Sequence, residues 1–346
     1  MRSKIRIGII GAGGIVLSRH LPALLAMPDV EIVAVSNSTY ASSERFCKEH
    51  LPHATPIKNW AELVALPDLD VVWIGTPPYM HAPISISALE AGRHVFTQAR
   101  MAMNLAEARE MLAAAKKRPH LVTAICPPPH GLKGDRVMQR LLGDEWIGKP
   151  LSVRLRSLSS IFLDPAAPVH WRQRIELSGL NVLTLGIYVE VLQRWLGPIR
   201  AVTARSRVVH RFRGLYEVRI PDIVHVLAEF ENGAEAVLEF SGVDAFAPSD
   251  SLAIYGDKGA IQYEFGSERI SAGRLGDCGL EPVEIPPGQA KEWTVERDFI
   301  EAVKNPSAPR PRPTFEEGVA YMRVVQAVAD SAASQKRVEV EIDPEV

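Results

Sequence analysis

A glycine-rich turn directly after the first apolar run constrains this chain more than any other feature. Ile5–Ile10 is a short run rich in β-branched residues, and it leads into Gly11-Ala-Gly-Gly-Ile15. Glycines in such a turn let backbone N–H groups approach a pyrophosphate, and the N-terminus of the next helix adds a positive dipole. A place after the first strand of a βαβ unit favours nucleotide binding over a glycine-rich turn without a ligand, although Val16 stands where a third small residue is usual.

Strand and helix patterns alternate as far as Cys126. Short apolar runs predict parallel strands, and the segments between them predict helices on both faces of the sheet. The predicted strands are Ile5–Ile10, Val30–Val35, Leu69–Gly75, His94–Thr97 and Leu121–Cys126, and the predicted helices are Arg19–Met27, Ser42–His50, Ile84–Ala91 and Leu105–Lys117. We therefore expect an α/β fold with a Rossmann dinucleotide-binding domain over residues 1–125.

The pattern changes at Pro127-Pro-Pro129, which forces an extended exit from the last parallel strand. Longer alternating segments follow and predict a mainly antiparallel sheet, with Glu231-Asn-Gly-Ala234 as a hairpin turn. The predicted elements are strands Leu151–Leu158, Ile199–His210, Ile223–Glu231, Ala234–Ser241, Leu252–Tyr255, Ala260–Phe265 and Arg337–Ile342, an apolar and therefore buried helix Leu180–Leu196, and a helix Phe315–Ala333. Residues 126–346 are expected to form a C-terminal α+β domain, with the helix at 315–333 packing back toward the N-terminal domain.

Charge and composition exclude several classes of protein. The 39 Lys and Arg residues nearly balance 41 Asp and Glu residues, whereas binding to nucleic acid or to an anionic membrane surface needs a basic surface. No window approaches the ~18 uncharged apolar residues of a membrane span. Cys47, Cys126 and Cys278 are odd in number and far apart, so we expect neither a disulfide framework nor a Cys-x-x-Cys metal site. Without a signal-peptide pattern, the protein is expected to be cytoplasmic.

Two loops bear on the choice of nucleotide. Val35-Ser-Asn-Ser-Thr39 lacks the acid that usually holds the ribose hydroxyls of NAD. Its small polar side chains tolerate a 2′-phosphate that Arg45 could approach, so the pattern favours NADP; the alternative is a plain loop with helix-capping serines. Gly75-Thr-Pro-Pro-Tyr-Met-His81 leaves the third strand where open α/β sheets bind ligands. His81 fits capping and packing as well as a direct role.

Three runs resemble the Gfo/Idh/MocA family of oxidoreductases: Gly11-Ala-Gly-Gly-Ile15, Thr76-Pro-Pro-Tyr-Met-His81 and Ala88-Leu-Glu-Ala-Gly-Arg-His-Val95. The resemblance continues through Trp171-Arg172, Gly256-Asp-Lys-Gly259, Asp298-Phe-Ile-Glu-Ala302 and Glu317-Gly318. It implies a C-terminal domain with a large open sheet that binds substrate and forms a homodimer or homotetramer, and NAD(P)-linked hydride transfer on sugars or polyols. The expected nucleotide contacts are Gly11, Gly13, Gly14, Ile15, Ser36, Asn37, Ser38, Thr76, Pro77, His81 and Gln98.

The first departure from the family pattern follows the fourth strand. Family members usually carry Glu-Lys-Pro there, with a lysine that contacts the nicotinamide ribose and the substrate hydroxyl, whereas this chain has Gln98-Ala-Arg100. Ala99 cannot transfer a proton. Arg100 is an anchor for anions rather than a base, because the pKa of an arginine exceeds about 12.

The second departure lies in the apolar helix. The family places an Asp and, four residues later, a His at the positions of Thr184 and Tyr188, and Asn181 is expected to share their helical face. A tyrosine at the histidine position also occurs in the glucose–fructose oxidoreductase branch, so Tyr188 is expected, with Thr184, to act in catalysis. Because a free tyrosine has a pKa of about 10, it would need a nearby cation such as Arg172 or a cofactor ribose. The alternative is a buried tyrosine bonded to backbone.

His130 is a further candidate for the proton transfer. It follows Cys126-Pro-Pro-Pro, which leaves the last parallel strand; the alternative is a loop histidine in water. Arg100, Arg172 and Asn181 are expected to bind substrate. The first hypothesis is an NAD(P)-dependent oxidoreductase of a sugar, polyol or related hydroxy compound. The alternatives are a nucleotide-binding regulator or accessory protein, and a lyase or isomerase with a tightly bound nucleotide.

Overall fold

Two units make up the chain, of which the computed structural model describes residues 4–341. The first runs to Pro127 and also contains Thr294–Val319; the second comprises Pro128–Trp293 and the chain from Ala320 onward. The sequence predicts a single domain over residues 126–346, whereas the segment Thr294–Val319 packs within the first unit. Among the described residues, no helix is long and apolar enough to cross a membrane.

The sheet of the first unit has six parallel strands in the order β3-β2-β1-β4-β5-β6. The strands are β1 Ile5–Ile10, β2 Val30–Ser36, β3 Thr55–Pro56, β4 Val71–Ile74, β5 His94–Thr97 and β6 Thr123–Ile125. Every residue of β4 is buried, as expected of a strand covered on both faces. The strand order reverses between β1 and β4, and the carboxyl ends there form the point at which doubly wound sheets bind ligands.

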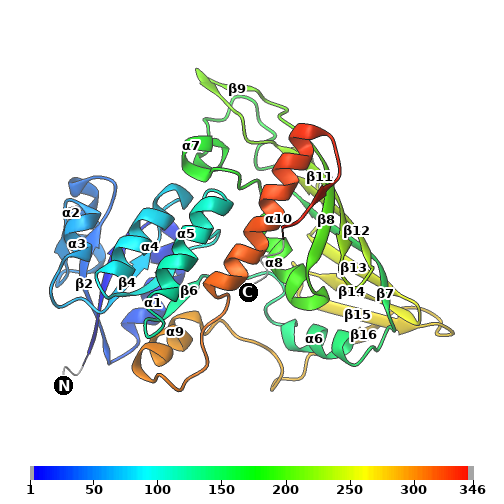
Figure 1. Cartoon of the computed structure of the whole chain (residues 1–346), viewed down its shortest axis with the longest axis horizontal. Coiled ribbons are helices and arrows are strands. Elements are labelled where there is room, and N and C mark those ends of the chain that lie inside the picture. Colours follow the sequence, from blue (N-terminus) through cyan, green and yellow to red (C-terminus); the bar gives the residue numbers. More distant parts are fainter. Residues whose placement is uncertain (1–3, 342–346) are drawn as a thin grey trace. The chain divides into compact units, whose positions relative to one another are not determined.

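Short polar side chains set where three helices of the first unit begin. Thr39, Asn59 and Asn104 each accept a hydrogen bond from a backbone N–H of the helix that follows. The helices are α1 Leu21–Leu25, α2 Tyr40–His50, α3 Trp60–Val64, α4 His81–Glu90, α5 Leu105–Lys116 and α9 Val295–Lys304. The predicted helix Arg19–Met27 is instead a π-helical segment, Val16–His20, followed by α1. Helices α4 and α5 lie side by side (Figure 1).

The sheet of the second unit has nine strands in the order β16-β15-β14-β13-β7-β12-β11-β8-β17, antiparallel except for the pair β7 and β12. The strands are β7 Pro150–Leu158, β8 Ile199–Arg207, β11 Ile223–Phe230, β12 Glu235–Ser241, β13 Ser251–Gly256, β14 Gly259–Glu264, β15 Arg269–Arg274, β16 Glu281–Val283 and β17 Val338–Glu339. A separate hairpin joins β9 Phe212–Arg213 to β10 Tyr216–Glu217. The last edge strand is shorter than predicted, and Ile342 lies outside the described residues.

Helices cover one face of this sheet. They include α6 Asp135–Gly143, α8 Leu185–Leu196 and α10 Phe315–Ser334, while the short helix α7 Ile175–Ser178 lies apart from the sheet. Most residues of α8 are buried, as its apolar sequence predicts, but it begins only at Leu185 because Gly179 and Leu183 have positive φ angles. Ser331 of α10 accepts a hydrogen bond from the Ala204 N–H of β8, and Figure 1 shows α8 and α10 on the same face of the sheet.

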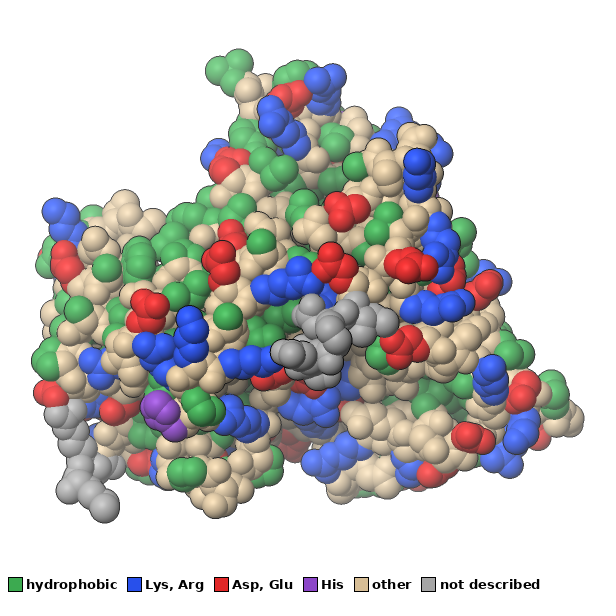
Figure 2. Space-filling model, viewed as in Figure 1, with side chains coloured by type: hydrophobic (Ala, Val, Ile, Leu, Met, Phe, Trp, Pro, Cys, Tyr) green, Lys and Arg blue, Asp and Glu red, His purple; other side chains and the backbone are tan. Residues whose placement is uncertain are grey.

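The charged side chains in Figure 2 are mixed rather than segregated by sign. Lysine and arginine lie among aspartate and glutamate over the face shown, with apolar side chains between them. This distribution agrees with the formal charge of −2 and gives this face no extended basic patch.

Candidate active site

The glycine-rich turn after β1 fits closely against the loop after β4. Gly11 has φ 84°, and a Cβ there would lie 2.6 Å from the Thr76 backbone nitrogen. The Gly11 N–H donates to Ser36 O and the Gly75 N–H donates to Ile10 O, both at 2.8 Å. A side chain at position 11 would therefore strain the backbone and push the two loops apart.

Asn37, at the end of β2, holds this turn in place. Its Oδ1 accepts the Ala12 N–H at 2.7 Å, and its Nδ2 donates to Ser42 Oγ at 3.3 Å. The Asn37 backbone N–H donates to Ser43 Oγ at 2.8 Å. The side chain expected to contact nucleotide is thus bonded to the turn that would cradle it.

A cavity of about 610 Å³ opens where β1, β2 and β4 end. Its lining residues are Ile10, Gly11, Ala12, Gly13, Ser36, Asn37, Ser38, Ser42, Lys58, Asn59, Trp60, Gly75, Thr76, Pro77, Tyr79 and Met80. Of the expected nucleotide contacts, Gly14, Ile15, His81 and Gln98 do not line it. No carboxylate lines it either, and the Thr76 Oγ1 is buried without a hydrogen-bond partner among residues 4–341. A buried hydroxyl of this kind needs a partner, and a dinucleotide offers one.

Lys58, Asn59 and Trp60 belong to this cavity although the sequence did not point to them. They follow β3, a strand of two residues that pairs with β2. The sequence signal of so short a strand is negligible, so its loop could not be placed beside Ser38 in advance. Arg45, expected near a 2′-phosphate, is exposed on α2 and does not line the cavity.

His81 connects two loops through its imidazole. Its Nε2 lies 2.7 Å from Thr76 O and its Nδ1 lies 2.9 Å from Arg100 O. Burial lowers the pKa of His81, so the imidazole is neutral and donates to one of these carbonyls at a time. His81 therefore orients the cavity wall from behind.

Gln98 takes part in a buried cluster rather than in the cavity. Its amide donates to His20 Nε2, and the His20 Nδ1–H in turn donates to Glu296 Oε1 at 2.5 Å. Trp73 and Phe96 pack around the imidazole with ring centroids 5.2 and 5.4 Å away. This cluster links the end of the π-helical segment Val16–His20, the residue after β5 and the first turn of α9.

A chain of hydroxyl groups in the second unit ends on a carboxylate that sequence reasoning missed. Asp250 directly precedes β13, and the pairing of Ser251 with Arg156 brings it beside Ser157 of β7. Asp250 Oδ2 accepts hydrogen bonds from Tyr188 Oη at 2.5 Å and Ser157 Oγ at 2.8 Å. Ser157 Oγ also lies 2.7 Å from Thr184 Oγ1.

Tyr188 is fully buried in this cluster. Burial, followed by the hydrogen bond to Asp250, raises the pKa of Tyr188 far above its usual range. The phenol is therefore protonated at neutral pH. The sequence left open a buried tyrosine bonded to backbone; the partner is instead a carboxylate.

The other residues expected to transfer a proton or bind substrate differ in how exposed they are. His130 is half-buried, with its ring centroid 5.5 Å from that of Tyr188. Arg172 is exposed and lies 4.4 Å over the Trp171 ring. Arg100 is buried. Asn181 is also buried, donates to Ser178 O at 2.7 Å and precedes α8, so it does not share a helical face with Tyr188 as predicted.

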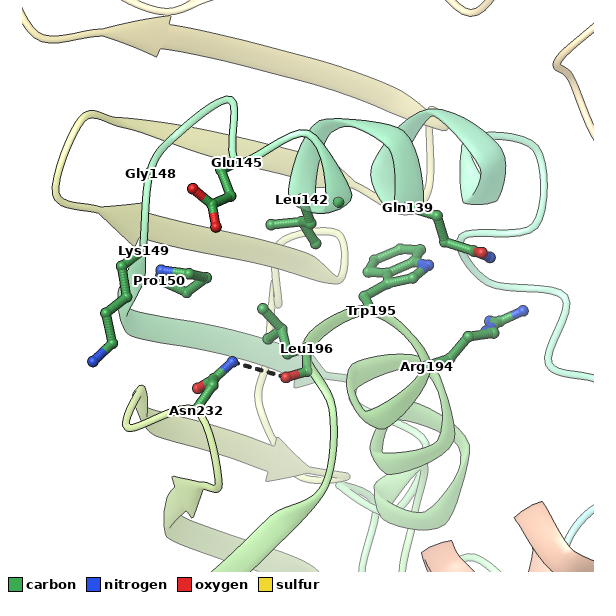
Figure 3. Close-up of a pocket in the computed structure, with 11 residues that line it drawn as sticks. Gln139, Leu142, Glu145, Gly148, Lys149, Pro150, Arg194, Trp195, Leu196 and Asn232 are labelled. Carbon is green, nitrogen blue, oxygen red and sulfur yellow. Dashed lines mark hydrogen bonds between the residues drawn. The ribbon is translucent and has the colours of Figure 1, made fainter.

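A second cavity, of about 530 Å³, belongs to the scaffold of the second unit (Figure 3). Arg194 on its wall is 9% exposed and pairs with Asp135 at 3.2 Å and Glu190 at 3.4 Å. Trp195 Nε1 donates to the same Asp135 at 2.8 Å. The network joins α6 to α8, and its two carboxylates already neutralise the guanidinium.

A glycine-rich turn at the point where the strand order of a parallel sheet reverses is typical of enzymes that bind a dinucleotide. Residues 5–125 match the oxidoreductase family with an NAD-binding Rossmann fold, and residues 136–262 match the C-terminal domain of the same family. The chain therefore belongs to the Gfo/Idh/MocA family of NAD(P)-dependent oxidoreductases, which confirms the family and fold class that the sequence predicts.

Known relatives cover almost the whole chain. The dTDP-3,4-didehydro-2,6-dideoxy-alpha-D-glucose 3-reductase of Streptomyces antibioticus is 30% identical over 314 residues, which are 87% of this chain and 89% of the relative. The levoglucosan dehydrogenase of Pseudarthrobacter phenanthrenivorans is 24% identical over 97% of this chain and 98% of its own. A solved levoglucosan dehydrogenase in complex with NADH superposes with a TM-score of 0.87 at 21% identity, over 98% of this chain and 100% of that one, and shows the shared fold.

Proposed function

We propose that this protein transfers a hydride between NADP(H) and a carbon that bears a hydroxyl or keto group in a sugar. The cavity after β1 and β4, with the partnerless Thr76 hydroxyl, carries the proposal. The reductase and the dehydrogenase that the chain resembles are both named for sugar substrates. When bound, the nicotinamide supplies the hydride acceptor or donor.

The residues of the cavity suit a dinucleotide. The Gly11–Gly13 turn carries no side chain larger than the methyl group of Ala12, which lets a pyrophosphate approach the backbone closely. Thr76 offers its buried hydroxyl as a hydrogen-bond donor or acceptor. Trp60 offers an aromatic surface at the end formed by β2 and β3.

NADP is proposed over NAD because of the groups at the end of β2. Lys58 lines the cavity together with the hydroxyls of Ser38 and Ser42, and no carboxylate there would repel a 2′-phosphate. Lys58 forms no ion pair with any other residue of the described chain. An ammonium group on a flexible stem is a suitable partner for a phosphate.

The exposed face of the nine-stranded sheet is proposed to join subunits into a homodimer or homotetramer in the cytoplasm. Leu227 of β11 and Tyr255 of β13 are 57% and 39% exposed on it, unusual for large apolar side chains. Arg156 and Glu239 are paired in register across β7 and β12, so the face also carries both signs of charge. Light scattering on the wild type and on Leu227→Lys tests this proposal: the variant should have a lower molar mass because fewer subunits associate.

Fluorescence titration of NADPH and NADH tests the nucleotide preference. Lys58→Ala should weaken NADPH binding about tenfold, near 1.4 kcal/mol, and leave NADH binding unchanged. Arg45→Ala is the matched control and should change neither. Equal losses of affinity for NADPH and NADH would show that Lys58 does not contact the 2′-phosphate.

Turnover is tested with levoglucosan and NADP⁺ and with 1,5-anhydro-D-fructose and NADPH, followed by a panel of aldoses, polyols and keto-deoxysugars. Oxidation or reduction of a panel member, seen as a change in nicotinamide absorbance, supports the proposal. An absence of nucleotide binding below millimolar concentrations would overturn it. Nucleotide binding without redox turnover, together with elimination or isomerisation of a sugar, would favour the lyase or isomerase alternative.

A further inference from the structure

The segment between the glycine-rich turn and α1 is π-helical. Within Val16–His20 the hydrogen bond from the Leu21 N–H runs to Val16 O, five positions earlier, where an α-helix would use the residue four positions earlier. Such segments are rare and are frequently found at functional sites. No side chain among residues 4–341 caps the start of this one, so its position depends on the contacts that its own side chains make.

Buried side chains anchor both ends of the π-helical segment. At its start, Val16 is fully buried and lies so close to Gly75 that a Cβ added at Gly75 would overlap with Val16 Cγ2. At its end, His20 has no exposed surface, accepts the amide N–H of Gln98 at Nε2 and donates from Nδ1 to Glu296 Oε1 at 2.5 Å. Gly75 lines the cavity after β1 and β4, whereas His20 does not. The second anchor therefore holds the segment from behind the cavity.

Gln98 also connects this cluster to the loop after β4. Its backbone N–H donates to Ile74 O at 3.1 Å, and the Gly75 N–H donates to Ile10 O at 2.8 Å. β1 and β4 are adjacent in the sheet, and the turn and the loop that follow them form two walls of the cavity. Both walls are thus joined, through short stretches of backbone, to the cluster that Glu296 completes.

We propose that Glu296 of α9 is a positioning residue of the nucleotide site: through His20 it holds the π-helical segment, and with it the glycine-rich turn, in the conformation that receives the pyrophosphate. This inference rests on the proposed nucleotide-dependent function. Without its carboxylate partner, His20 releases the segment to α-helical hydrogen bonding, which moves Gly13 relative to the loop after β4. The turn must then be restored when nucleotide binds, and the free energy needed for this ordering lowers the affinity.

The expected effect is confined to binding. Neither His20 nor Glu296 lines the cavity, so their replacement leaves the groups that contact the nucleotide in place. A residue that only prepares the site for nucleotide raises the dissociation constant and the KM for NADPH when it is replaced, and leaves kcat at saturating NADPH unchanged. A loss of folded protein would instead lower the fraction of active sites at every NADPH concentration.

Fluorescence titration of NADPH, at a temperature at which circular dichroism shows each variant to be folded, tests the proposal. Glu296→Ala should weaken NADPH binding about tenfold. Glu296→Gln should recover most of this loss, because glutamine retains an oxygen that accepts the His20 Nδ1–H. In a His20→Leu background, Glu296→Ala should cause no further loss, since both changes remove the same contact. If Glu296→Ala does not fold, Glu296→Asp replaces it, because the shorter side chain draws the carboxylate away from His20.

Phe299→Ala is the matched control. Phe299 lies three positions further along α9, is fully buried and packs edge-on against Trp73 and Phe96, with ring centroids 5.7 and 5.5 Å away. Its truncation should lower the urea midpoint about as much as Glu296→Ala but leave NADPH affinity unchanged, because His20 keeps its carboxylate partner.

An affinity for NADPH equal to that of the wild type in folded Glu296→Ala or Glu296→Asp would overturn the proposal. An equal loss of affinity in Phe299→Ala would overturn it as well, because any damage to this core would then weaken binding. Failure of the wild type to bind NADPH and NADH would instead overturn the proposed function.

Discussion

Gly11→Ala should lower the free energy of unfolding of the nucleotide-binding unit, whereas Gly13→Ala should not. The φ angle of 84° at Gly11 costs an L-residue about 1–2 kcal/mol. The new Cβ would also lie 2.6 Å from the backbone nitrogen and Cγ2 of Thr76. Relief of such a contact costs about 1–3 kcal/mol, since the loop after β4 must move. Together these effects predict a loss of about 2–5 kcal/mol.

Gly13 is the matched control. A Cβ there meets nothing within 4 Å, and Gly13 lines the cavity, so the methyl group would enter the space proposed for the pyrophosphate. Gly13→Ala should leave the apoprotein as stable as the wild type or stabilise it by about 0.4–1 kcal/mol, through lost freedom of the unfolded chain. Its affinity for NADPH should fall at least about tenfold.

Urea unfolding of the apoprotein, followed by circular dichroism, measures the first effect, and NADPH fluorescence titration measures the second. The two variants should separate: Gly11→Ala loses stability, and Gly13→Ala loses affinity alone. Equal stability of Gly11→Ala and the wild type would show that the turn does not require glycine at that position, and the reasoning from its backbone would fail.

Three further predictions concern the first unit. Glu296→Ala should lower the free energy of unfolding by about 3–5 kcal/mol because it leaves the buried His20 without its carboxylate, while Glu296→Gln, which keeps an acceptor oxygen, should lose clearly less; equal losses would argue against the hydrogen bond. The lowered pKa of His81 means that the unfolded chain binds a proton more readily, so melting temperature should fall as the pH drops below about 6.5, less steeply in His81→Gln; parallel curves would contradict this. Thr76→Val should leave the apoprotein's urea midpoint unchanged, since the hydroxyl bonds to none of residues 4–341, but should weaken NADPH binding; unchanged binding would exclude the hydroxyl from the nucleotide site.

The parallel sheet was predictable because its strands carry strong local signals. β1, β2, β4 and β5 are apolar runs bounded by turns, and the structure places them within a residue or two of their predicted bounds. Strand β3 has two residues, one of them proline, and no periodicity can reveal so short an element. The sequence therefore could not predict that the loop after β3 lines the cavity.

The site residues that were missed depend on contacts far apart in the sequence. Asp250 lies in no recognisable motif, and Tyr188, which donates to it, is 62 positions earlier. Gln98 was expected at the nucleotide because of its place after β5, but its amide serves His20, whose other partner is 276 positions beyond that histidine. Local patterns identify where a strand ends; they do not identify which tertiary partner a polar side chain will take.

The first unit cannot be completed until helix α9 has been synthesised, late in translation. The ribosome releases Ile5–Ile10 and His20 early, but Glu296, which completes the buried cluster, is made only after most of the other unit has emerged. A nascent chain that ends near Pro127 thus carries a whole parallel sheet with an unfinished interior. The nucleotide-binding unit begins first but is completed only after residues 128–293 of the other unit have been made, so premature termination before α9 yields a product whose first unit lacks its last segment.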